Sequence, residues 1–245
     1  MSKKKIIIKP VKDKGDKSTI KTEEHLPNIP FLALFSGKTG CGKTTNLVNF
    51  LASNDFLRPY FKPRNIYIFS PLINDFKMEG LIKSLDIPDL NIFTELDMEL
   101  LNNLYDTLAE QFEDEIYKFD KAFPKLVLID DFGFSTNMRK RGGENAISRF
   151  FCNCRKHLIS LVCVNQHYVQ NLPVQRSNMN YAMIFNTSDK NLDLIAEENS
   201  YLSSKKEFKK MFRENVKEKH DFIIINYFNT REEGLYLNKN FEKIA

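Results

Sequence analysis

The chain has 245 residues, of which 42% are hydrophobic and 28% are charged, so it can bury a full core as one folded domain. No apolar run approaches the roughly 18 residues of a membrane span, which excludes a membrane-spanning class and leads us to expect no membrane partner. The formal net charge of +4 is compatible with nucleic-acid binding but also common in proteins that bind none.

The four cysteines are interpreted as reduced thiols in an intracellular setting. Cys152, Cys154 and Cys163 lie near His157, which invites a comparison with zinc sites. However, their spacing matches no common zinc pattern, and two cysteines two positions apart on a helix point to different faces. We therefore do not predict a zinc site.

Residues 1–25 are rich in lysine and poor in large apolar side chains, which is typical of a flexible basic arm. We favour a solvated arm over one that touches DNA phosphates or an acidic partner. The folded domain is predicted over residues 26–245.

Residues 37–44 read GKTGCGKT and fit the G-x-x-x-x-G-K-[ST] phosphate loop. An apolar run at 31–35 predicts a buried strand before the loop, and apolar positions within 45–52 predict a helix after it. We expect Lys43 to reach the β- and γ-phosphates of ATP and the Thr44 hydroxyl to help bind Mg²⁺. The predicted nucleotide-binding residues are Gly37, Lys38, Thr39, Gly40, Cys41, Gly42, Lys43, Thr44 and Thr45.

Between the phosphate loop and residue 120 the sequence predicts strands and a helix, and we assign no catalytic or binding residue there. Residues 66–69 predict a second buried strand, and 91–93 a short one. Over 96–119 the apolar positions follow a helical period and the other face is acidic. We interpret this helix as structural, because its carboxylates spread along a solvated face.

Residues 126–129 are apolar and run into Asp130 and Asp131, which predicts a strand that delivers two acids to the phosphate loop. We expect Asp130 to hold Mg²⁺ and Asp131 to orient and deprotonate the attacking water. A small-molecule kinase would not need the second acid, so the pair favours hydrolysis.

The loop at 132–143 contains Arg139, Lys140 and Arg141. Two interpretations stay open: the loop contacts a DNA backbone or a neighbouring subunit, or it is a solvated loop without a partner. A helix is predicted over 145–157 and a buried strand over 158–164. Gln166 follows that strand, which we place next to the strand of the phosphate loop, so the amide is positioned to sense the γ-phosphate.

The remaining elements are a buried strand at 181–185, helices at 189–199 and from Ser203 or Ser204 to about Lys219, and a terminal hairpin. The hairpin strands are predicted at 222–225 and 235–237. The second helix carries a basic stripe, which we interpret as a solvated face in preference to a DNA contact. The stripe consists of Lys205, Lys209, Arg213 and Lys217.

Taken together, these motifs resemble the FtsK–HerA superfamily of ring-forming DNA motors. Within it, the chain resembles the genome-packaging ATPases of poxviruses, giant viruses and their virophages, and among these it is most similar to those of Sputnik-like virophages. The resemblance covers roughly residues 28–240. The residues that carry it are 36–44, 128–131, 155–157 ahead of Ile159 and Ser160, Asn165 and Gln166, and Leu172 and Pro173 with Arg176, Ser177 and Asn178.

The resemblance implies an α/β fold: a P-loop NTPase with a RecA-like, mostly parallel central sheet flanked by helices. It also implies an arginine donated by a neighbouring subunit to the transferring phosphoryl group. Arg155 is the first choice for this arginine and Arg176 the second, while Arg141 stays open. The chain departs from the wider superfamily at Asp131, where glutamate is usual, which weakens the assignment of the base.

The function that these patterns predict is an ATP- and Mg²⁺-dependent motor that translocates viral double-stranded DNA into a preformed capsid. The alternatives are a helicase or replication ATPase acting on single strands, and a nucleotide-gated DNA-binding scaffold. Expected partners are double-stranded DNA, further copies of the chain in a ring of five or six, and capsid or portal-vertex proteins. The expected location is the virion or the viral factory in the host cytoplasm.

Overall fold

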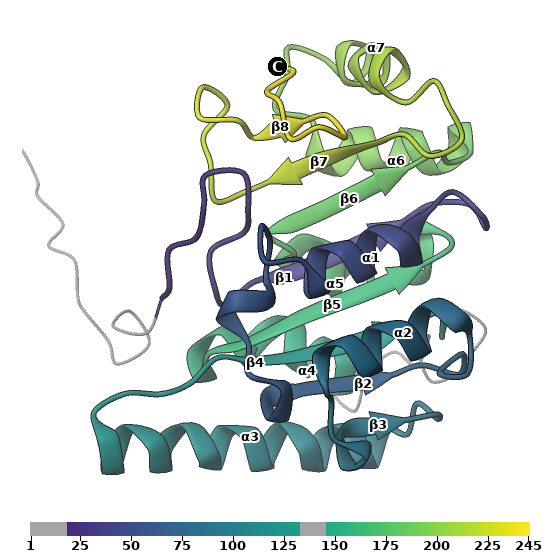
Figure 1. The fold of residues 1–245 in the computed structure, drawn as a ribbon. Helices are drawn as coiled ribbons and strands as arrows, with labels where there is room; N and C mark the ends of the chain where they lie inside the picture. Colours follow the sequence, from purple (N-terminus) through teal and green to yellow (C-terminus); the bar gives the residue numbers. More distant parts are fainter. Residues whose placement is uncertain (1–18, 133–145) are drawn as a thin grey trace, which may run out of the picture.

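The computed structural model describes residues 19–132 and 146–245. Over these residues eight strands form one sheet in the order β3-β2-β4-β5-β1-β6-β7-β8 (Figure 1). The neighbouring pairs from β3 to β6 are parallel, and β7 pairs antiparallel with both β6 and β8. The strands are β1 (Leu32–Ser36), β2 (Ile66–Phe69), β3 (Ile92–Phe93), β4 (Lys125–Asp130), β5 (Ile159–Asn165), β6 (Tyr181–Phe185), β7 (Phe222–Asn226) and β8 (Tyr236–Leu237). The mostly parallel α/β sheet and the C-terminal hairpin are therefore confirmed.

Helices cover both faces of the sheet, because alternate strand residues point to opposite faces and both sets are apolar. Leu34 packs in one core with residues of α3, α4, α6 and α7. Phe35, its neighbour in β1, packs in a second core with residues of α1 and α2. The helices are α1 (Lys43–Ala52), α2 (Phe76–Leu85), α3 (Met98–Phe119), α4 (Ala146–Asn153), α5 (Pro173–Asn178), α6 (Asp189–Asn199) and α7 (Lys205–Asn215). Short 3-10 helices are η2 (Arg58–Tyr60), η3 (Pro63–Asn65), η4 (Asp89–Asn91), η6 (Cys154–His157) and η7 (Tyr168–Gln170).

Helix ends are where the structure departs most from the sequence prediction. The predicted helix at 145–157 is α-helical only to Asn153 and continues as the 3-10 helix η6. Ser204 caps α7, as predicted, since its hydroxyl accepts a hydrogen bond from the Glu207 N–H. The predicted end of this helix near Lys219 is wrong, because α7 ends at Asn215.

The segment before β1 is attached to the domain within the described residues. Ile20 and Ile29 exchange two backbone hydrogen bonds of 2.8 and 2.9 Å, and Leu26 is buried. These contacts involve part of the stretch assigned to the basic arm, and the boundary at residues 25 and 26 stays a prediction. No helix in the described part of the chain is both long and apolar enough to cross a bilayer.

Candidate nucleotide site

The phosphate loop connects β1 to α1 at the carboxyl edge of the parallel strands (Figure 1). Gly40 has φ 75° and Gly42, the N-cap of α1, has φ 99°, a region that other residues rarely adopt. A Cβ on Gly37 would lie 2.5 Å from the Cβ of Phe185, so a side chain has no room there. Three glycines thus let the loop adopt the tight turn that directs backbone N–H groups toward an anion.

Lys43 begins α1 and folds back across the loop. Its ammonium donates hydrogen bonds to the carbonyl oxygens of Gly37 at 2.7 Å and Lys38 at 3.1 Å. The ammonium is therefore held against the first two residues of the loop. The hydroxyl of Thr45, in the first turn of α1, accepts a hydrogen bond of 2.8 Å from Nζ of Lys77 in α2.

The side chain of Cys41, within the phosphate loop, is buried, and burial raises the pKa of its thiol. We therefore assign this side chain a packing role.

Asp130 is the last residue of β4 and is only 3% exposed. Its Oδ2 accepts a hydrogen bond of 3.2 Å from the hydroxyl of Ser70, just after β2. Burial, together with the neighbouring Asp131 carboxylate, raises the pKa of Asp130 to about 6. Sequence reasoning missed Ser70, because only the pairing of β2 with β4 brings this serine to Asp130.

Asp131 and Gln166 are in direct contact. The amide Nε2 of Gln166 donates to both carboxylate oxygens of Asp131, at 3.1 and 3.4 Å. The Gln166 Oε1 in turn accepts a hydrogen bond of 3.1 Å from the hydroxyl of Thr39 in the phosphate loop. Asp131 has φ 52°, a left-handed conformation that turns the chain away from β4 directly after the first acid. A hydrogen-bonded line thus runs from the loop across β5 to the second acid.

The order of strands sets this geometry. β5 pairs with β1 on one side and with β4 on the other, so Gln166 lies between the loop and the two acids. The prediction that the Gln166 strand neighbours the strand of the phosphate loop is confirmed. Asp130 comes from β4, which is separated from the strand of the phosphate loop by β5.

Arg155 lies in η6, immediately before β5, and is exposed. Because β5 is parallel to β1, this position is at the amino edge of the sheet, opposite the chain's own phosphate loop. Among the described residues no carboxylate pairs with Arg155. The Arg155 side chain therefore lies at the edge of the sheet opposite the nucleotide site of the same chain.

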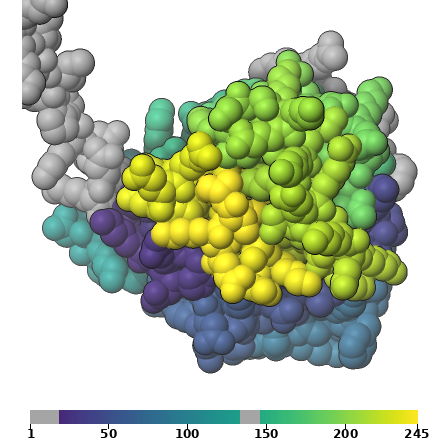
Figure 2. Space-filling model, turned by 90° about the horizontal axis from the view of Figure 1, so that it is seen from above, coloured from purple at the N-terminus to yellow at the C-terminus, as the bar shows by residue number. Residues whose placement is uncertain are grey.

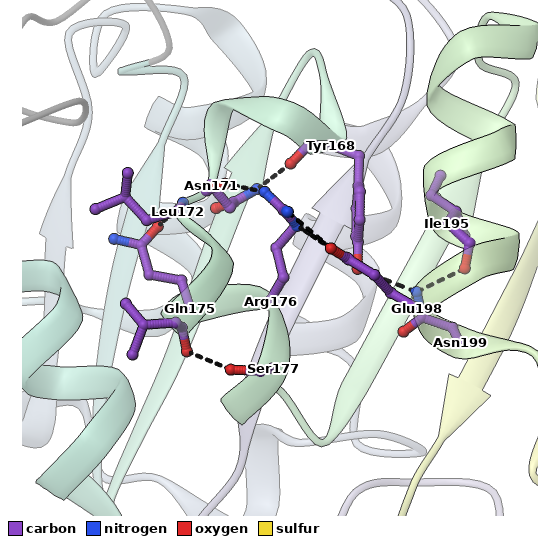
Figure 3. A network of polar contacts seen from close by, with 10 residues as sticks. Tyr168, Asn171, Leu172, Gln175, Arg176, Ser177, Ile195, Glu198 and Asn199 are labelled. Atoms are coloured by element: carbon purple, nitrogen blue, oxygen red, sulfur yellow. Dashed lines mark hydrogen bonds and ion pairs between the residues drawn. The ribbon is translucent and has the colours of Figure 1, made fainter. Parts of the chain in front are cut away.

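Arg176 is paired with other residues of the same chain (Figure 3). Its Nε and Nη2 donate to the Glu198 carboxylate at 2.7 to 3.1 Å, and Nη1 donates to the Asn171 carbonyl at 2.6 Å. The guanidinium lies 5.5 Å from the centre of the Tyr168 ring, and the arginine side chain is only 9% exposed. A role as the donated arginine would require this arrangement to open.

Other basic candidates divide into two groups. Arg139, Lys140 and Arg141 lie outside the described residues. Three members of the basic stripe on α7 form ion pairs with acids of α6, which favours the interpretation of a structural face over a DNA contact. The pairs are Lys205 with Glu197, Lys209 with Asp193, and Arg213 with Asp189.

The cysteines do not form a cluster. Cys154 and Cys163 are buried and Cys152 is exposed, and burial raises the pKa of both buried thiols. Within 19–132 and 146–245, no group of three or more His, Cys, Asp or Glu side chains could hold a metal by itself.

The loop and the acids fit a magnesium nucleotide. Asp130 is a buried carboxylate whose raised pKa reflects a shortage of compensating positive charge, which a cation would supply. The hydroxyl of Thr44, in the first turn of α1, would be the second oxygen ligand, with the phosphates completing the shell. The glycine turn and Lys43 would hold the phosphates.

This sheet, loop and pair of strand-end acids define a P-loop ATPase. The chain belongs to the poxvirus A32 protein family, whose model matches residues 20–235. The resemblance to the poxvirus branch of packaging ATPases is thereby confirmed, and the narrower likeness to virophage members stays a prediction. No curated protein matches the chain.

Solved structures agree on the fold. The genome packaging NTPase B204 of Sulfolobus turreted icosahedral virus 2, in complex with AMPPCP, superposes with a TM-score of 0.56 and 10% identity over 81% of this chain and 93% of B204. B204 of Sulfolobus turreted icosahedral virus, a DNA-packaging ATPase, gives 0.53 and 14% over 81% and 94%. The pCW3 conjugation coupling protein TcpA with ATPγS gives 0.50 and 13% over 85% and 66%. At these identities the likeness concerns the fold alone.

Proposed function

We propose that this chain is an ATP-driven motor that moves double-stranded viral DNA into a preformed capsid. The observation that carries the proposal is the hydrogen-bonded line from Thr39 through Gln166 to Asp131. It links the phosphate loop to the acid that would activate water, an arrangement that serves hydrolysis and not binding alone. Membership of the poxvirus A32 family and the fold shared with the packaging enzyme B204 support the same function.

Each residue of the site has a role in this proposal. The loop amides and Lys43 hold the triphosphate, while Thr44 and Asp130 hold Mg²⁺, which would neutralise charge on the phosphate oxygens when bound. Asp131 takes the proton of the attacking water. Gln166 keeps that carboxylate in place and reports the γ-phosphate to the loop through Thr39.

We propose Arg155 as the arginine donated to the neighbouring subunit's nucleotide. Its exposure and its position opposite the phosphate loop suit a ring in which the amino edge of one sheet meets the carboxyl edge of the next. Arg176 is the weaker choice because its guanidinium is bound to Glu198. Capsid or portal-vertex proteins are the expected docking partners, in the virion or in the host cytoplasm.

The test is steady-state ATP hydrolysis in Mg²⁺ without DNA, with duplex DNA and with single-stranded DNA. A packaging motor should turn over faster with duplex DNA and with rising protein concentration, and Lys43→Ala should abolish turnover. Stimulation by single strands alone would indicate a helicase or replication ATPase. ATP binding without turnover, by protein shown to oligomerise on duplex DNA, would refute the motor and leave a nucleotide-gated scaffold.

A further inference from the structure

The connection between α7 and β7, residues 216–221, lies beside the phosphate loop (Figure 1). A Cβ on Gly40 would lie 3.7 Å from Cε and 3.8 Å from Nζ of Lys219. A Cβ on Gly42 would lie 3.3 Å from Nδ1 of His220. A cationic and an aromatic side chain therefore face the loop from the C-terminal part of the chain.

Asp221 fixes the turn that presents these side chains. Its Oδ2 accepts hydrogen bonds from the backbone N–H groups of Lys217 at 3.1 Å and Glu218 at 2.8 Å. Its Oδ1 pairs at 2.7 Å with Nζ of Lys239, from the residues after β8, and the carboxylate is nearly buried. Figure 2 shows these two segments, yellow-green and yellow, side by side on one surface. The turn is thus anchored at its base, and residues 219 and 220 project from it.

The strand order determines which end of a nucleotide meets this turn. Asp130 and Asp131 approach from β4, on one side of β1, whereas β6 and β7 lie on the other side. Asp130 would hold Mg²⁺ and Asp131 would activate the water that attacks the γ-phosphate, so the γ-phosphate end of a bound nucleotide would point toward β4. The α-phosphate and the nucleoside must then extend toward β6 and β7, where the turn lies.

We propose that Lys219 and His220 form the second wall of the nucleotide site. Lys219 contacts the α- and β-phosphates with its ammonium, and His220 lies against the nucleoside. Within the described residues no carboxylate pairs with Lys219, whereas the α7 cations Lys205 and Lys209 are paired with acids. An ammonium without an acidic partner, held against a phosphate loop, is suited to bind a polyphosphate. The proposal rests on the loop holding the nucleotide, and it adds two binding residues to that site.

The experiment is calorimetric titration of the full chain with Mg²⁺ and ATP, ADP or inorganic tripolyphosphate. Lys219→Met should lower the affinity for all three ligands by about tenfold, which corresponds to the loss of one charge-assisted hydrogen bond at a partly exposed site. His220→Ala should lower the affinity for ATP and ADP and leave the affinity for tripolyphosphate unchanged, because the histidine contacts only the nucleoside. Lys206→Met removes an exposed α7 charge remote from the turn and serves as the matched control. Lys219→Arg should restore most of the affinity.

Two results would overturn the assignment. Suppose that Lys219→Met binds ATP with the same affinity as Lys206→Met, while Lys43→Ala no longer binds ATP. The loop then binds the nucleotide, and Lys219 is not part of the second wall. If Lys43→Ala also binds ATP normally, the nucleotide does not occupy the loop, and both this assignment and the proposed motor fail. Circular dichroism of each variant establishes that the exposed substitutions leave the fold intact.

Discussion

Asp130 illustrates how a single residue is held in an environment that opposes its charge. Burial and the Asp131 carboxylate raise its pKa to about 6, above the value of about 3.9 for an unfolded chain. The folded state therefore binds this proton more tightly than the unfolded state. The contribution of the group to stability falls as the pH rises from about 4 to 6, and the full penalty applies above pH 6.

We therefore expect Asp130→Asn to stabilise the metal-free protein at pH 8 by up to about 3 kcal/mol, because the neutral amide removes the buried charge. Near pH 4 the gain should largely disappear. Urea unfolding in EDTA at both pH values measures the difference, and Asp55→Asn, at an exposed position, is the control. Equal stability of wild type and Asp130→Asn at pH 8 would show that the carboxylate is not destabilised by its surroundings.

Gln166 gives the second residue-scale prediction. Its amide contacts Asp131 and Thr39 but makes no bond to Lys43, so its loss should affect chemistry more than binding. Gln166→Leu is expected to lower kcat by about a hundredfold with little change in KM for ATP. Steady-state kinetics with a parallel ADP titration measures this. A rise in KM with kcat unchanged would instead make Gln166 a binding residue.

Prediction from sequence succeeded at this scale where a motif has fixed spacing. The loop at 37–44 could be identified because its glycines and Lys43 are close in the chain. Ser70 could not, because a serine after a strand is common and only the pairing of β2 with β4 brings it to Asp130. The same is true of Lys77 and its bond to Thr45.

At the scale of elements, the ion pair between α5 and α6 is the contact most open to test. Arg176 and Glu198 join the two helices in a site where the arginine is 9% exposed. Removing Arg176 leaves the Glu198 carboxylate, whose side chain is 29% exposed, without its charge-assisted hydrogen bonds. Arg176→Ala should therefore cost about 2 kcal/mol and lower Tm by about 4–8 °C. Thermal unfolding measures the loss.

The exposed pair of Arg213 and Asp189, which joins α7 to α6, is the matched control. Arg213→Ala should change stability by less than about 1 kcal/mol, since both partners are solvated. Arg176→Lys should recover little, because one ammonium cannot reproduce the two-pronged contact with Glu198. An Arg176→Ala protein of normal stability but without turnover would favour the finger role over the structural one.

Most elements were predicted to within a residue or two, as for β2, β6 and α6, and the clear misses are the ends of α4 and α7. The period of α3 is clear over many turns, and its start is defined by Asp97, which accepts hydrogen bonds from the N–H groups of Glu99 and Leu100. The end of α7 was missed because the apolar and basic spacing continues past Asn215. The turn that follows depends on Lys239, which no local pattern could link to Asp221.

At the scale of the whole molecule, buried apolar strands and their alternation with helices were enough to predict a mostly parallel sheet. The full order of the strands is a property of contacts between distant segments, such as the pairing of β4 with β5. It determines which groups can cooperate within one subunit. The strand order places the phosphate loop, the two acids and Gln166 at one edge of the sheet and Arg155 at the opposite edge.

This separation makes a prediction about assemblies. Lys43→Ala and Arg155→Ala subunits should each be inactive alone, but mixing them should restore turnover, because the Lys43→Ala subunit still donates its Arg155 to the intact loop of its neighbour. With random mixing of equal amounts in a closed ring, about a quarter of the interfaces combine an intact loop with an intact arginine. Hydrolysis measured on pre-mixed, duplex-bound protein should approach that fraction of wild type.

A mixture of Lys43→Ala with Lys43→Ala, Arg155→Ala double-variant subunits is the control, because it contains no intact loop and should stay inactive. If the two single variants fail to complement although each assembles on DNA, Arg155 does not act between subunits. The donated arginine would then have to come from Arg176 after its bond to Glu198 opens, or from Arg141. The first alternative is tested directly, since Glu198→Gln would release Arg176 and should raise turnover only if that arginine reaches a neighbouring site.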